Sequence, residues 1–466
     1  MIETERLTRT LNPKTLAVIG DVSRTNYRWL RCMSTFQGNI YSVQIDPNEI
    51  PGIEEMGIKN YQSLTEIPED IDFVLVAVPR VAANAVLKDC INKGVAGAAF
   101  FTSGFAETHV QEAIDLQKEF TDIARESGIA VIGPNCMGLY NPAAGVRFGE
   151  KQAVGFEGDT TFISQSGGHA GDISAAAYAN GVPVNKVVSF GNGVVLESAD
   201  YLEYFGNDEQ TQFIGMYIEG LHDGPRFTKI LKDVAKRKPV VLWKGGMTDA
   251  GRRATASHTA SLAGSDKVWD AMCKQTGALQ VESVDEMIDL INALRLLPKF
   301  TGNGLGVTGG SGGQSVAMAD TFARAGLRIP DLSNESQEKL GSWFSLVGAS
   351  FGNPVDMGSN REQVDVILDT LTADENVDCL LVQVRPPQDD DDDRERMQTQ
   401  IDSLKRLKST TPKPIAVIAH SPTPAHDGSA IADLSKTLRE ESIPTFISYE
   451  RTANVIQKVL EYNQNH

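Results

Sequence analysis

The sequence predicts an α/β protein of three domains, each built on a parallel sheet, and three observations support this class. Short apolar runs rich in β-branched residues alternate with helical patterns along the chain, which is typical of βαβ units. The length of 466 residues suits roughly three domains of about 150 residues each. The later part of the chain contains one series of motifs twice, which indicates a duplicated unit.

The first domain is predicted over residues 1–145 as a Rossmann-like fold. One of its helices is the pattern Val81–Gly94, in which Gly94 is expected to end the helix. Ligands of such open sheets bind at the carboxyl ends of the strands. The expected strands are Thr15–Gly20, Ile40–Asp46, Asp72–Pro79, Gly97–Gly104 and Ile129–Asn135.

These strand ends offer a pocket lined by backbone groups, but the pattern does not favour NAD. Gly20 is the single glycine where the dinucleotide fingerprint needs three. Asp46 ends the second expected strand, as a ribose-binding acid would, although an acid before Pro47 is as often a turn residue. A nicotinamide-dependent oxidoreductase is therefore a minor alternative. The candidate pocket residues are Gly20, Asp21, Val22, Ser23, Val78, Pro79, Ser103, Pro134, Asn135 and Cys136.

The second domain is predicted over residues 155–295 as a flavodoxin-like unit. After the strand TFIS, an alanine-rich helix begins within QSGG, so hydroxyls and backbone amides gather at a helix N-terminus. Such an end binds anions through its amides and dipole, although serine at an N-cap is also ordinary helix chemistry. Glu219 ends the strand FIGMYIEG, next to the expected neighbour VVLWK. The candidate phosphate-binding residues are Ser164, Ser166, Gly167 and Gly168.

The third domain, residues 300–466, repeats the second in the same order of motifs. QSGGHAGD is echoed by GGSGGQSV, SFGNGV by SFGNPV, and KPVVLWK by KPIAVIA. The second copy has Val384 and Arg385 near the place of Glu219. Its histidines, His420 and His426, and the run Asp389–Asp393 are interpreted as solvated loop residues rather than as a metal site.

The two copies differ most in the connection Gly245–Gly264, which contains His258 and has no counterpart in the second copy. Connections between a strand and a helix usually have two to six residues, whereas this one has about twenty. Ser265 is expected to cap the next helix, and Gly277 to end it. We interpret the connection as a mobile catalytic loop, with an ordinary surface loop as the alternative.

His258 suits nucleophilic chemistry if a carboxylate holds its ring. A neutral imidazole can attack phosphorus when its other nitrogen donates to an acceptor, and Glu219 is a reasonable acceptor. The turn Ser164–Gly168 could supply donors to a phosphoryl group, with Arg252 and Arg253 as further candidates. We do not expect serine hydrolase chemistry.

The composition excludes several classes of partner. A net charge of −18 gives no basic footprint for nucleic acid or an anionic membrane. The chain has no apolar run of membrane-spanning length, and its start is no signal peptide. Five cysteines without a CxxC pair fit a reducing cytoplasm and predict no zinc site.

Six motifs together carry a resemblance to a known family. They are IGPNCMGLYNP, SGFAE, ISQSGG, SFGN, YIEGLHDGPRF and GRRATASHTASLAGSD. Through them, nearly the whole chain resembles the α subunit of NDP-forming acyl-CoA synthetases, the ADP-forming acetyl-CoA synthetase type. These proteins are related to the succinyl-CoA ligase α subunit.

The resemblance implies that the first domain binds coenzyme A through the pocket residues given above. It implies that His258 becomes phosphohistidine while Glu219 holds it. Acyl-CoA, phosphate and ADP would be interconverted with a carboxylic acid, coenzyme A and ATP through acyl phosphate. His169 and Asn192 are expected in the acyl pocket, and this chain has SQSGGHAG where many relatives have SQSGALG.

The resemblance also implies a partner, because the three predicted domains leave no ATP-grasp domain. We expect an ATP-grasp β subunit that carries Mg²⁺ and ATP or ADP, in an αβ heteromer or a larger assembly. The first turn, DVSRTNYRW, departs from the family by lacking its glycines. A CoA-binding regulatory paralogue without turnover is the main alternative.

Overall fold

The computed structural model describes residues 2–259, 266–386 and 391–466, and gives only the backbone for 256–259, 392–393 and 424–426. The chain divides into two compact units, Met1–Met287 and Ile288–His466. The first unit contains two sheets and the second unit contains one. The predicted boundaries of three domains stay a prediction.

The first sheet has six parallel strands in the order β3-β2-β1-β4-β5-β6. Chain order reverses between β1 and β4, and open α/β sheets bind ligands at that point. Helix α4 ends at Lys93 with Gly94 at φ +74°, as predicted. The strands are β1 (Thr15–Ile19), β2 (Asn39–Val43), β3 (Lys59–Tyr61), β4 (Phe73–Val76), β5 (Gly97–Phe100) and β6 (Ala130–Ile132).

Helices and short 3-10 turns connect these strands, and their apolar faces pack on a core that includes Val74, Phe100 and Phe120. The expected strands are present, whereas β3 was not expected from the sequence. The helices are α1 (Thr4–Leu11), α2 (Arg28–Cys32), α3 (Ile50–Glu55), α4 (Ala83–Lys93) and α5 (Gln111–Ser127), with η1 (Ser23–Thr25), η2 (Met33–Thr35), η3 (Leu64–Glu66), η4 (Arg80–Ala82) and η5 (Ala106–Thr108).

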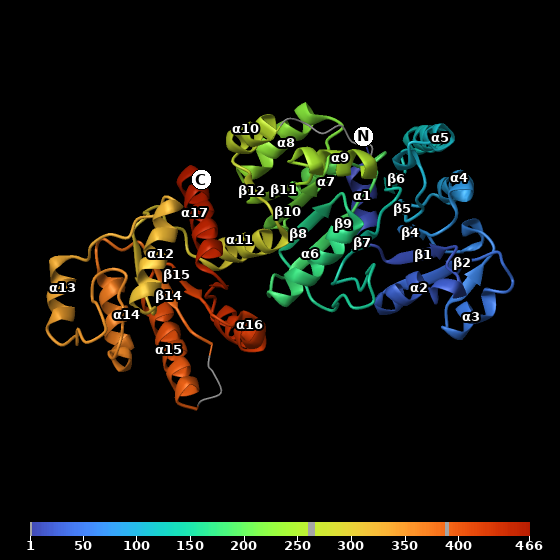
Figure 1. Ribbon diagram of the computed structural model, residues 1–466. Helices are drawn as coiled ribbons and strands as arrows, with labels where there is room; N and C mark the ends of the chain where they lie inside the picture. The colour runs from blue at the N-terminus through green and yellow to red at the C-terminus, as the bar shows by residue number, and fades with distance from the viewer. Residues whose placement is uncertain (1, 260–265, 387–390) are drawn as a thin grey trace. The chain divides into compact units, whose positions relative to one another are not determined.

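The second sheet has the order β12-β11-β10-β8-β9-β7, with β7 antiparallel to β9 and the other pairs parallel. Figure 1 shows α6 crossing in front of β8 and β9, which it contacts. The strands are β7 (Gly138–Tyr140), β8 (Thr160–Ser164), β9 (Val184–Ser189), β10 (Phe213–Ile218), β11 (Val240–Lys244) and β12 (Leu279–Val281). The helices are α6 (Gly167–Ala179), α7 (Ser198–Asn207), α8 (Gly224–Ala235), α9 (Asp249–Thr259), α10 (Asp266–Thr276) and α11 (Val284–Leu296).

The third sheet repeats the order of the second, β16-β15-β14-β13 against β12-β11-β10-β8. Val355 forms a bridge with Thr308 of β13, in the place where β9 pairs with β8. The duplication expected from the motifs is therefore visible in the topology. The elements are β13 (Leu305–Thr308), β14 (Cys379–Gln383), β15 (Ile415–Ile418), β16 (Thr445–Phe446), α12 (Gly312–Arg324), α13 (Asn334–Gly341), η6 (Arg361–Gln363), α14 (Val364–Ala373), α15 (Asp391–Thr410), α16 (Pro424–Glu440) and α17 (Tyr449–Asn465).

Strand register also aligns the two copies residue by residue. Tyr217 pairs with Ser164 across β10 and β8, and Val382 pairs with Thr308 across β14 and β13. Since Ser164 corresponds to Gly309 in the repeated motif, Arg385 occupies the position of Glu219. The second copy therefore carries a positive charge where the first carries a negative one.

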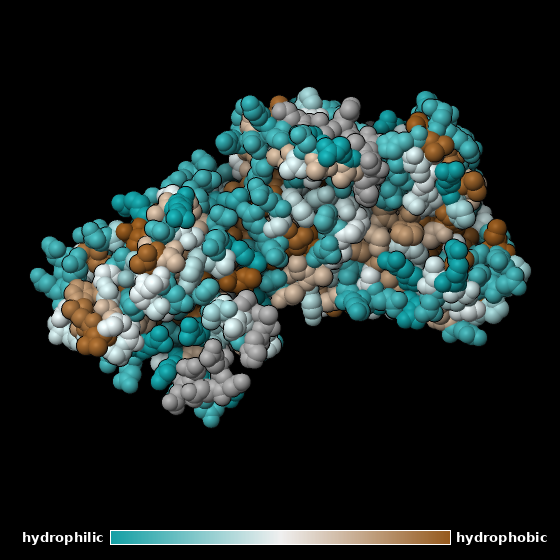
Figure 2. Space-filling view, in the orientation of Figure 1, coloured by the Kyte–Doolittle hydropathy of each residue, from teal (hydrophilic) through white to brown (hydrophobic). Residues whose placement is uncertain are grey.

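The surface of the second unit has an apolar patch just after α13. Leu346 and Val347 are largely exposed there, and Figure 2 shows a brown cluster at the end of that helix. Among the described residues, no helix combines the length and the apolar character needed to cross a bilayer.

The prediction of one long loop over Gly245–Gly264 is wrong, because Asp249–Thr259 forms helix α9. The Thr248 hydroxyl accepts a hydrogen bond from the Gly251 amide at 3.0 Å, as an N-cap side chain does. Arg252 pairs with Asp266 at 3.0 Å and also with Asp249. Alanine and arginine favour helix, which outweighs the small polar residues that suggested a loop. Residues 260–265, including the expected cap Ser265, lie outside the described part of the chain.

Candidate active site

Glu219 follows β10 directly and is buried, with 5% of its surface exposed. The Gln165 side chain fixes the backbone here, since its Oε1 accepts from the amides of Glu219 at 2.8 Å and Gly220 at 3.1 Å. Tyr217 points to the same face two residues earlier, and its hydroxyl donates to Glu219 Oε1 at 3.2 Å. The sheet therefore holds this carboxylate in one place at the end of the strand.

An aromatic cluster forms one side of the carboxylate. The ring of His169 lies edge-on to Tyr217 at 4.4 Å and close to Trp243 at 4.5 Å, measured between centroids. His169 Nδ1 is 3.7 Å from Asp172 Oδ2 and makes no hydrogen bond with the described residues. Burial and the Glu219 charge raise the pKa of Tyr217, so its hydroxyl keeps its proton. His169 thus lies on the Glu219 side of α6, and its predicted role in the acyl pocket stays a prediction.

Lys244 ends the neighbouring strand β11 and is also buried. Its Nζ donates to the Glu219 carbonyl oxygen at 2.8 Å and to the carbonyl of Gly245. Burial lowers the pKa of this ammonium, while the charges of Glu219 and Asp266 act in the opposite direction. Lys244 therefore ties the ends of β10 and β11 together beneath the candidate site.

The chain after β11 passes very close to this cluster because Gly245 and Gly246 lack side chains. A Cβ atom on Gly245 would lie 2.5 Å from the Tyr217 hydroxyl. Gly246 has φ +76°, and a Cβ there would lie 2.7 Å from Thr255 Oγ1. Helix α9 thus folds back over the strand end and also contacts η5. The backbone of His258 belongs to α9, and its side chain lies outside the described part.

The N-terminus of α6 lies beside Glu219, as the phosphate-site prediction requires. Ser166 is the N-cap, and its hydroxyl accepts from the His169 amide at 3.4 Å. Ser164 is fully buried, and its hydroxyl donates to the Ser166 carbonyl at 2.7 Å, so it shapes the turn. The amides of Gly167 and Gly168 belong to the first helical turn, whose N–H groups have no partners within a helix.

In the first sheet, Gly20 and Val78 meet at the switch point between β1 and β4. Gly20 has φ +79°, and a Cβ atom there would lie 2.6 Å from Val78 Cγ1. Val22 and Val78 are partly exposed, while Ser23, Pro79 and Ser103 are exposed at the same edge. The predicted pocket residues of β1, β4 and β5 are therefore brought to one edge of the sheet.

Two acidic residues organise the first turn of this edge. Asp21 is buried and accepts from the Leu30 amide at 2.8 Å, and burial raises the pKa of its carboxyl. Glu49 accepts from the Ser23 amide at 2.6 Å and from the Ser23 hydroxyl at 3.1 Å. The donors that a ligand phosphate would use at Ser23 are thus bound to a carboxylate of this chain.

The turn Pro134–Cys136 lies between β6 of the first sheet and β7 of the second sheet. Burial raises the pKa of the Cys136 thiol to about 12, and its Sγ donates to the Phe100 carbonyl at 3.4 Å, so it is not a nucleophile. The Asn135 amide donates to the Thr102 carbonyl at 2.9 Å. Met137 follows, and a Cβ on Gly167 would lie 2.9 Å from it. This turn therefore adjoins the N-terminus of α6.

Asn192 makes hydrogen bonds to the turn Pro134–Cys136 and to two polar side chains nearby. Its Nδ2 donates to Glu107 Oε2 at 2.8 Å and to Gln117 Oε1 at 3.0 Å. The Asn192 amide donates to the Pro134 carbonyl at 2.9 Å. These contacts give Asn192 a positioning role at the turn, and its place in an acyl pocket stays a prediction.

Sequence reasoning did not include Gln165, Tyr217 or Lys244 among the site residues. A lysine that ends the apolar run VVLWK and a tyrosine two residues before Glu219 were the available signals. Gln165 lies within the turn Ser164–Gly168, but its contact with the Glu219 backbone depends on the β8–β10 pairing. Within the described ranges, no group of three or more His, Cys, Asp or Glu side chains could hold a metal ion.

Comparison with known families and proteins gives a consistent result. Residues 14–142 match the CoA binding domain family, and residues 157–294 match the succinyl-CoA ligase like flavodoxin domain. The chain is 36% identical over 377 residues to the α subunit of acetate–CoA ligase (ADP-forming) II of Pyrococcus furiosus, covering 79% of this chain and 80% of that subunit.

Another relative is longer than this chain, which spans about two thirds of its length. The chain is 31% identical over 461 residues to acetate–CoA ligase (ADP-forming) I of Archaeoglobus fulgidus, which covers 98% of this chain and 64% of that protein. Among solved structures, dinucleotide-forming acetyl-coenzyme A synthetase 1 of Ca. Korarchaeum cryptofilum, in complex with phosphate and ADP, superposes with a TM-score of 0.82 at 28% identity. The match covers 99% of this chain and 97% of that one. The chain belongs to the family of ADP-forming acetate–CoA ligases, in which it corresponds to the α part.

Proposed function

We propose that this chain is the α part of an ADP-forming acyl-CoA synthetase, with His258 as the phosphorylated residue and Glu219 as the group that holds it. The observation that supports this most is the buried carboxylate at the end of β10, beside the N-terminus of α6. His258 belongs to the helix that follows the neighbouring strand β11. A carboxylate that accepts from one imidazole nitrogen leaves the other free to attack phosphorus.

The proposed reaction has three steps, written here toward ATP. Inorganic phosphate attacks the carbonyl carbon of acyl-CoA, the C–S bond breaks, and coenzyme A leaves with acyl phosphate as the product. A ring nitrogen of His258 then attacks phosphorus, the P–O bond to the acyl group breaks, and the carboxylate leaves. The terminal oxygen of ADP finally takes the phosphoryl group and regenerates neutral His258.

The amides of Gly167 and Gly168 would stabilise the phosphoryl oxygens in this mechanism. Donors fixed before the reaction stabilise developing negative charge without reorganisation. Ser164 and Ser166 would hold the turn in shape, since their hydroxyls are engaged within it. Gln165, Tyr217 and Lys244 would keep Glu219 in position.

Coenzyme A would bind along the edge that runs from Gly20 to the turn Pro134–Cys136. The match of residues 14–142 to CoA binding domains supports this assignment. Its phosphates would approach Ser23, where they would have to displace the Glu49 carboxylate. The thiol end would then lie near Met137 and the N-terminus of α6.

The α-subunit name of the Pyrococcus relative supports a partner for this chain. The partner would be an ATP-grasp subunit that binds Mg²⁺ and ADP, and α9 would move to bring phosphohistidine to it. The five free cysteines are buried, which suits a reducing compartment such as the cytoplasm.

Thiol release tests the proposed activity. The chain and an ATP-grasp partner are incubated with acetyl-CoA, phosphate, ADP and Mg²⁺, and free thiol and ATP are measured together. We expect equal amounts of both products, and repeated turnover only when acetyl-CoA, phosphate, ADP and Mg²⁺ are all present. Binding of coenzyme A without any turnover would instead favour the regulatory paralogue.

A further inference from the structure

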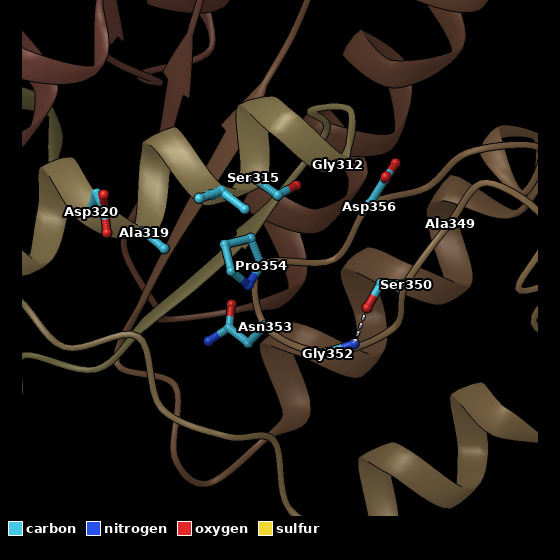
Figure 3. A pocket seen from close by; sticks show the side chains of 11 residues that line it. Gly312, Ser315, Ala319, Asp320, Ala349, Ser350, Gly352, Asn353, Pro354 and Asp356 are labelled. Carbon is cyan, nitrogen blue, oxygen red and sulfur yellow. Dashed lines mark hydrogen bonds between the residues drawn. The ribbon is translucent and has the colours of Figure 1, made fainter.

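A cavity of about 490 Å³ lies against α12 in the second unit. Figure 3 shows Ser315 and Asp320 on that helix, facing Asn353 and Pro354. The volume of the cavity falls within the range of small-molecule sites, about 300–1,000 Å³. The proposed reaction makes no use of this cavity, so its chemistry can be considered by itself.

The duplication shows that three polar side chains at this cavity are peculiar to the second copy. Alignment of the repeated SGG and SFGN motifs pairs Ser315 with Ala170, Asp320 with Ala175, and Asp356 with Val195. The second copy therefore has a hydroxyl and two carboxylates where the first copy has alkyl side chains only. These polar groups are not needed to build the fold, since the first copy folds in the same topology without them.

Ser315 has a hydroxyl that no described part of the chain satisfies. It borders the cavity with 7% of its surface exposed, and its Oγ makes no hydrogen bond with the described residues. Buried polar groups nearly always have a partner. Asn353, on the opposite wall, is engaged, since its Nδ2 donates to the Leu305 carbonyl at 2.7 Å and its Oδ1 accepts from the Val307 amide at 3.0 Å. Ser315 is thus available to a group that enters the cavity.

The two carboxylates give both ends of the cavity a net negative charge. Asp356 Oδ1 accepts from the Gly358 amide at 3.1 Å, and a Cβ atom on Gly312 would lie 3.3 Å from Asp356 Oδ2. Asp356 therefore lies at the N-terminus of α12, whose dipole offsets only about half of one negative charge. Asp320 is 3.6 Å from Arg324 in an exposed pair, which is a weak interaction. None of the described residues that border the cavity is basic.

The spacing of these charges favours an elongated cation. A helix rises about 1.5 Å per residue, so the eight residues from Gly312 to Asp320 place the two carboxylates about 12 Å apart. With a hydrogen bond of about 2.8 Å from an ammonium group at each end, a chain of about four methylenes spans the rest. Val316 and Ala319 lie between the two charges on the same helix face and present carbon to such a chain.

We propose that the cavity bordered by Ser315, Val316, Asp320 and Asp356 binds a linear diamine. One ammonium group pairs with Asp356 and donates to the Ser315 hydroxyl, and the other pairs with Asp320. A single metal ion does not fit, because its oxygen ligands lie within about 2.6 Å and these carboxylates are too far apart to share it. This ligand site goes beyond the proposed function and does not depend on it.

The test is calorimetry on the full chain with three probes: butane-1,4-diamine, butylamine and Mg²⁺. Low salt is used because exposed charges are screened. We expect the diamine to bind roughly fivefold more tightly than butylamine, since it gains one exposed charge pair. It should also bind more tightly than Mg²⁺, which carries the same charge but cannot span the site.

Two variants use the residues that the first copy has at the matched positions. Asp320→Ala should lower the affinity for the diamine to that for butylamine, whereas Ser315→Ala should weaken both amines about threefold. Asp433→Ala is the matched control, because it removes an exposed carboxylate from α16, and it should leave all three affinities unchanged.

The inference is overturned if the diamine binds no more tightly than butylamine, or if Asp320→Ala and Ser315→Ala both keep the wild-type affinities. Equal binding of Mg²⁺ and the diamine, or equal weakening by Asp433→Ala, would assign the binding to the net charge of −18 and overturn it as well. Failure of all three probes to bind would overturn this inference and leave the proposed function unaffected.

Discussion

Replacement of Gln165 by leucine should destabilise the first unit and displace Glu219. Gln165 Oε1 accepts from two buried amides, those of Glu219 and Gly220, and leucine has a similar size but no acceptor. A buried donor without a partner costs about 1–3 kcal/mol, so the two amides together cost about 2–6 kcal/mol. A loss of this size is large against the total stability of a domain, about 5–15 kcal/mol.

Urea unfolding followed by hydrogen exchange measures this loss where it arises. Peptides that contain β10 and Glu219 should lose protection at lower urea in Gln165→Leu, while peptides from the second unit should not change. Gln212→Leu is the control, since Gln212 is exposed and surface changes cost within about 0.5 kcal/mol. A destabilisation below about 1 kcal/mol in Gln165→Leu would refute the reasoning.

Three further predictions follow from individual side chains. Glu49→Gln removes the negative charge on the Ser23 donors and should tighten coenzyme A binding by roughly tenfold, as calorimetry would show; an unchanged affinity would place the phosphates elsewhere. Cys136, whose pKa is raised to about 12, should resist iodoacetamide at pH 8 in the native chain and react after unfolding; rapid native labelling would contradict its burial. Because burial lowers the pKa of Lys244 below its ordinary 10.5, the unfolded chain binds that proton more tightly, so the free energy of unfolding should rise with pH just below 10.5. That rise should be absent in Lys244→Met, and its persistence would assign it to another group.

The strands were predictable because buried parallel strands are continuous apolar runs. Thr160–Ser164 and Val240–Lys244 lie where such runs occur, and the duplicated motifs correctly predicted that their sheet would recur. The short strands β3 and β7 were missed, since KNY and GLY carry no pattern distinct from a turn. Their pairing depends on neighbours that are distant in sequence.

The site was predictable only in its outline. Glu219 and the turn at Ser166 follow recognisable strands, so their meeting at one sheet edge could be inferred. Helix α9 could not be inferred from the sequence, because its stability depends on the Thr248 cap and on the ion pair of Arg252 with Asp266. The bond between Ser23 and Glu49 joins residues 26 positions apart, and composition alone gives no sign of it.

The surroundings of His169 could not be inferred from its place after SGG. Its ring packs on Tyr217 and Trp243, and its predicted role in the acyl pocket stays a prediction. Residues two apart on a helix do not share a face. Gly171, which the sequence analysis did not single out, therefore lies on another face of α6 and borders a cavity of about 530 Å³.

Intact-mass analysis after incubation with acetyl phosphate tests the phosphohistidine most directly. The account predicts an acid-labile phosphoryl adduct on the wild-type chain that ADP and the ATP-grasp partner remove. The adduct should be absent in His258→Ala and should form at least 100-fold more slowly in Glu219→Gln, roughly the loss expected when an imidazole loses its holding carboxylate. An adduct that persists in His258→Ala, or a wild-type chain that never gains one, would contradict the account.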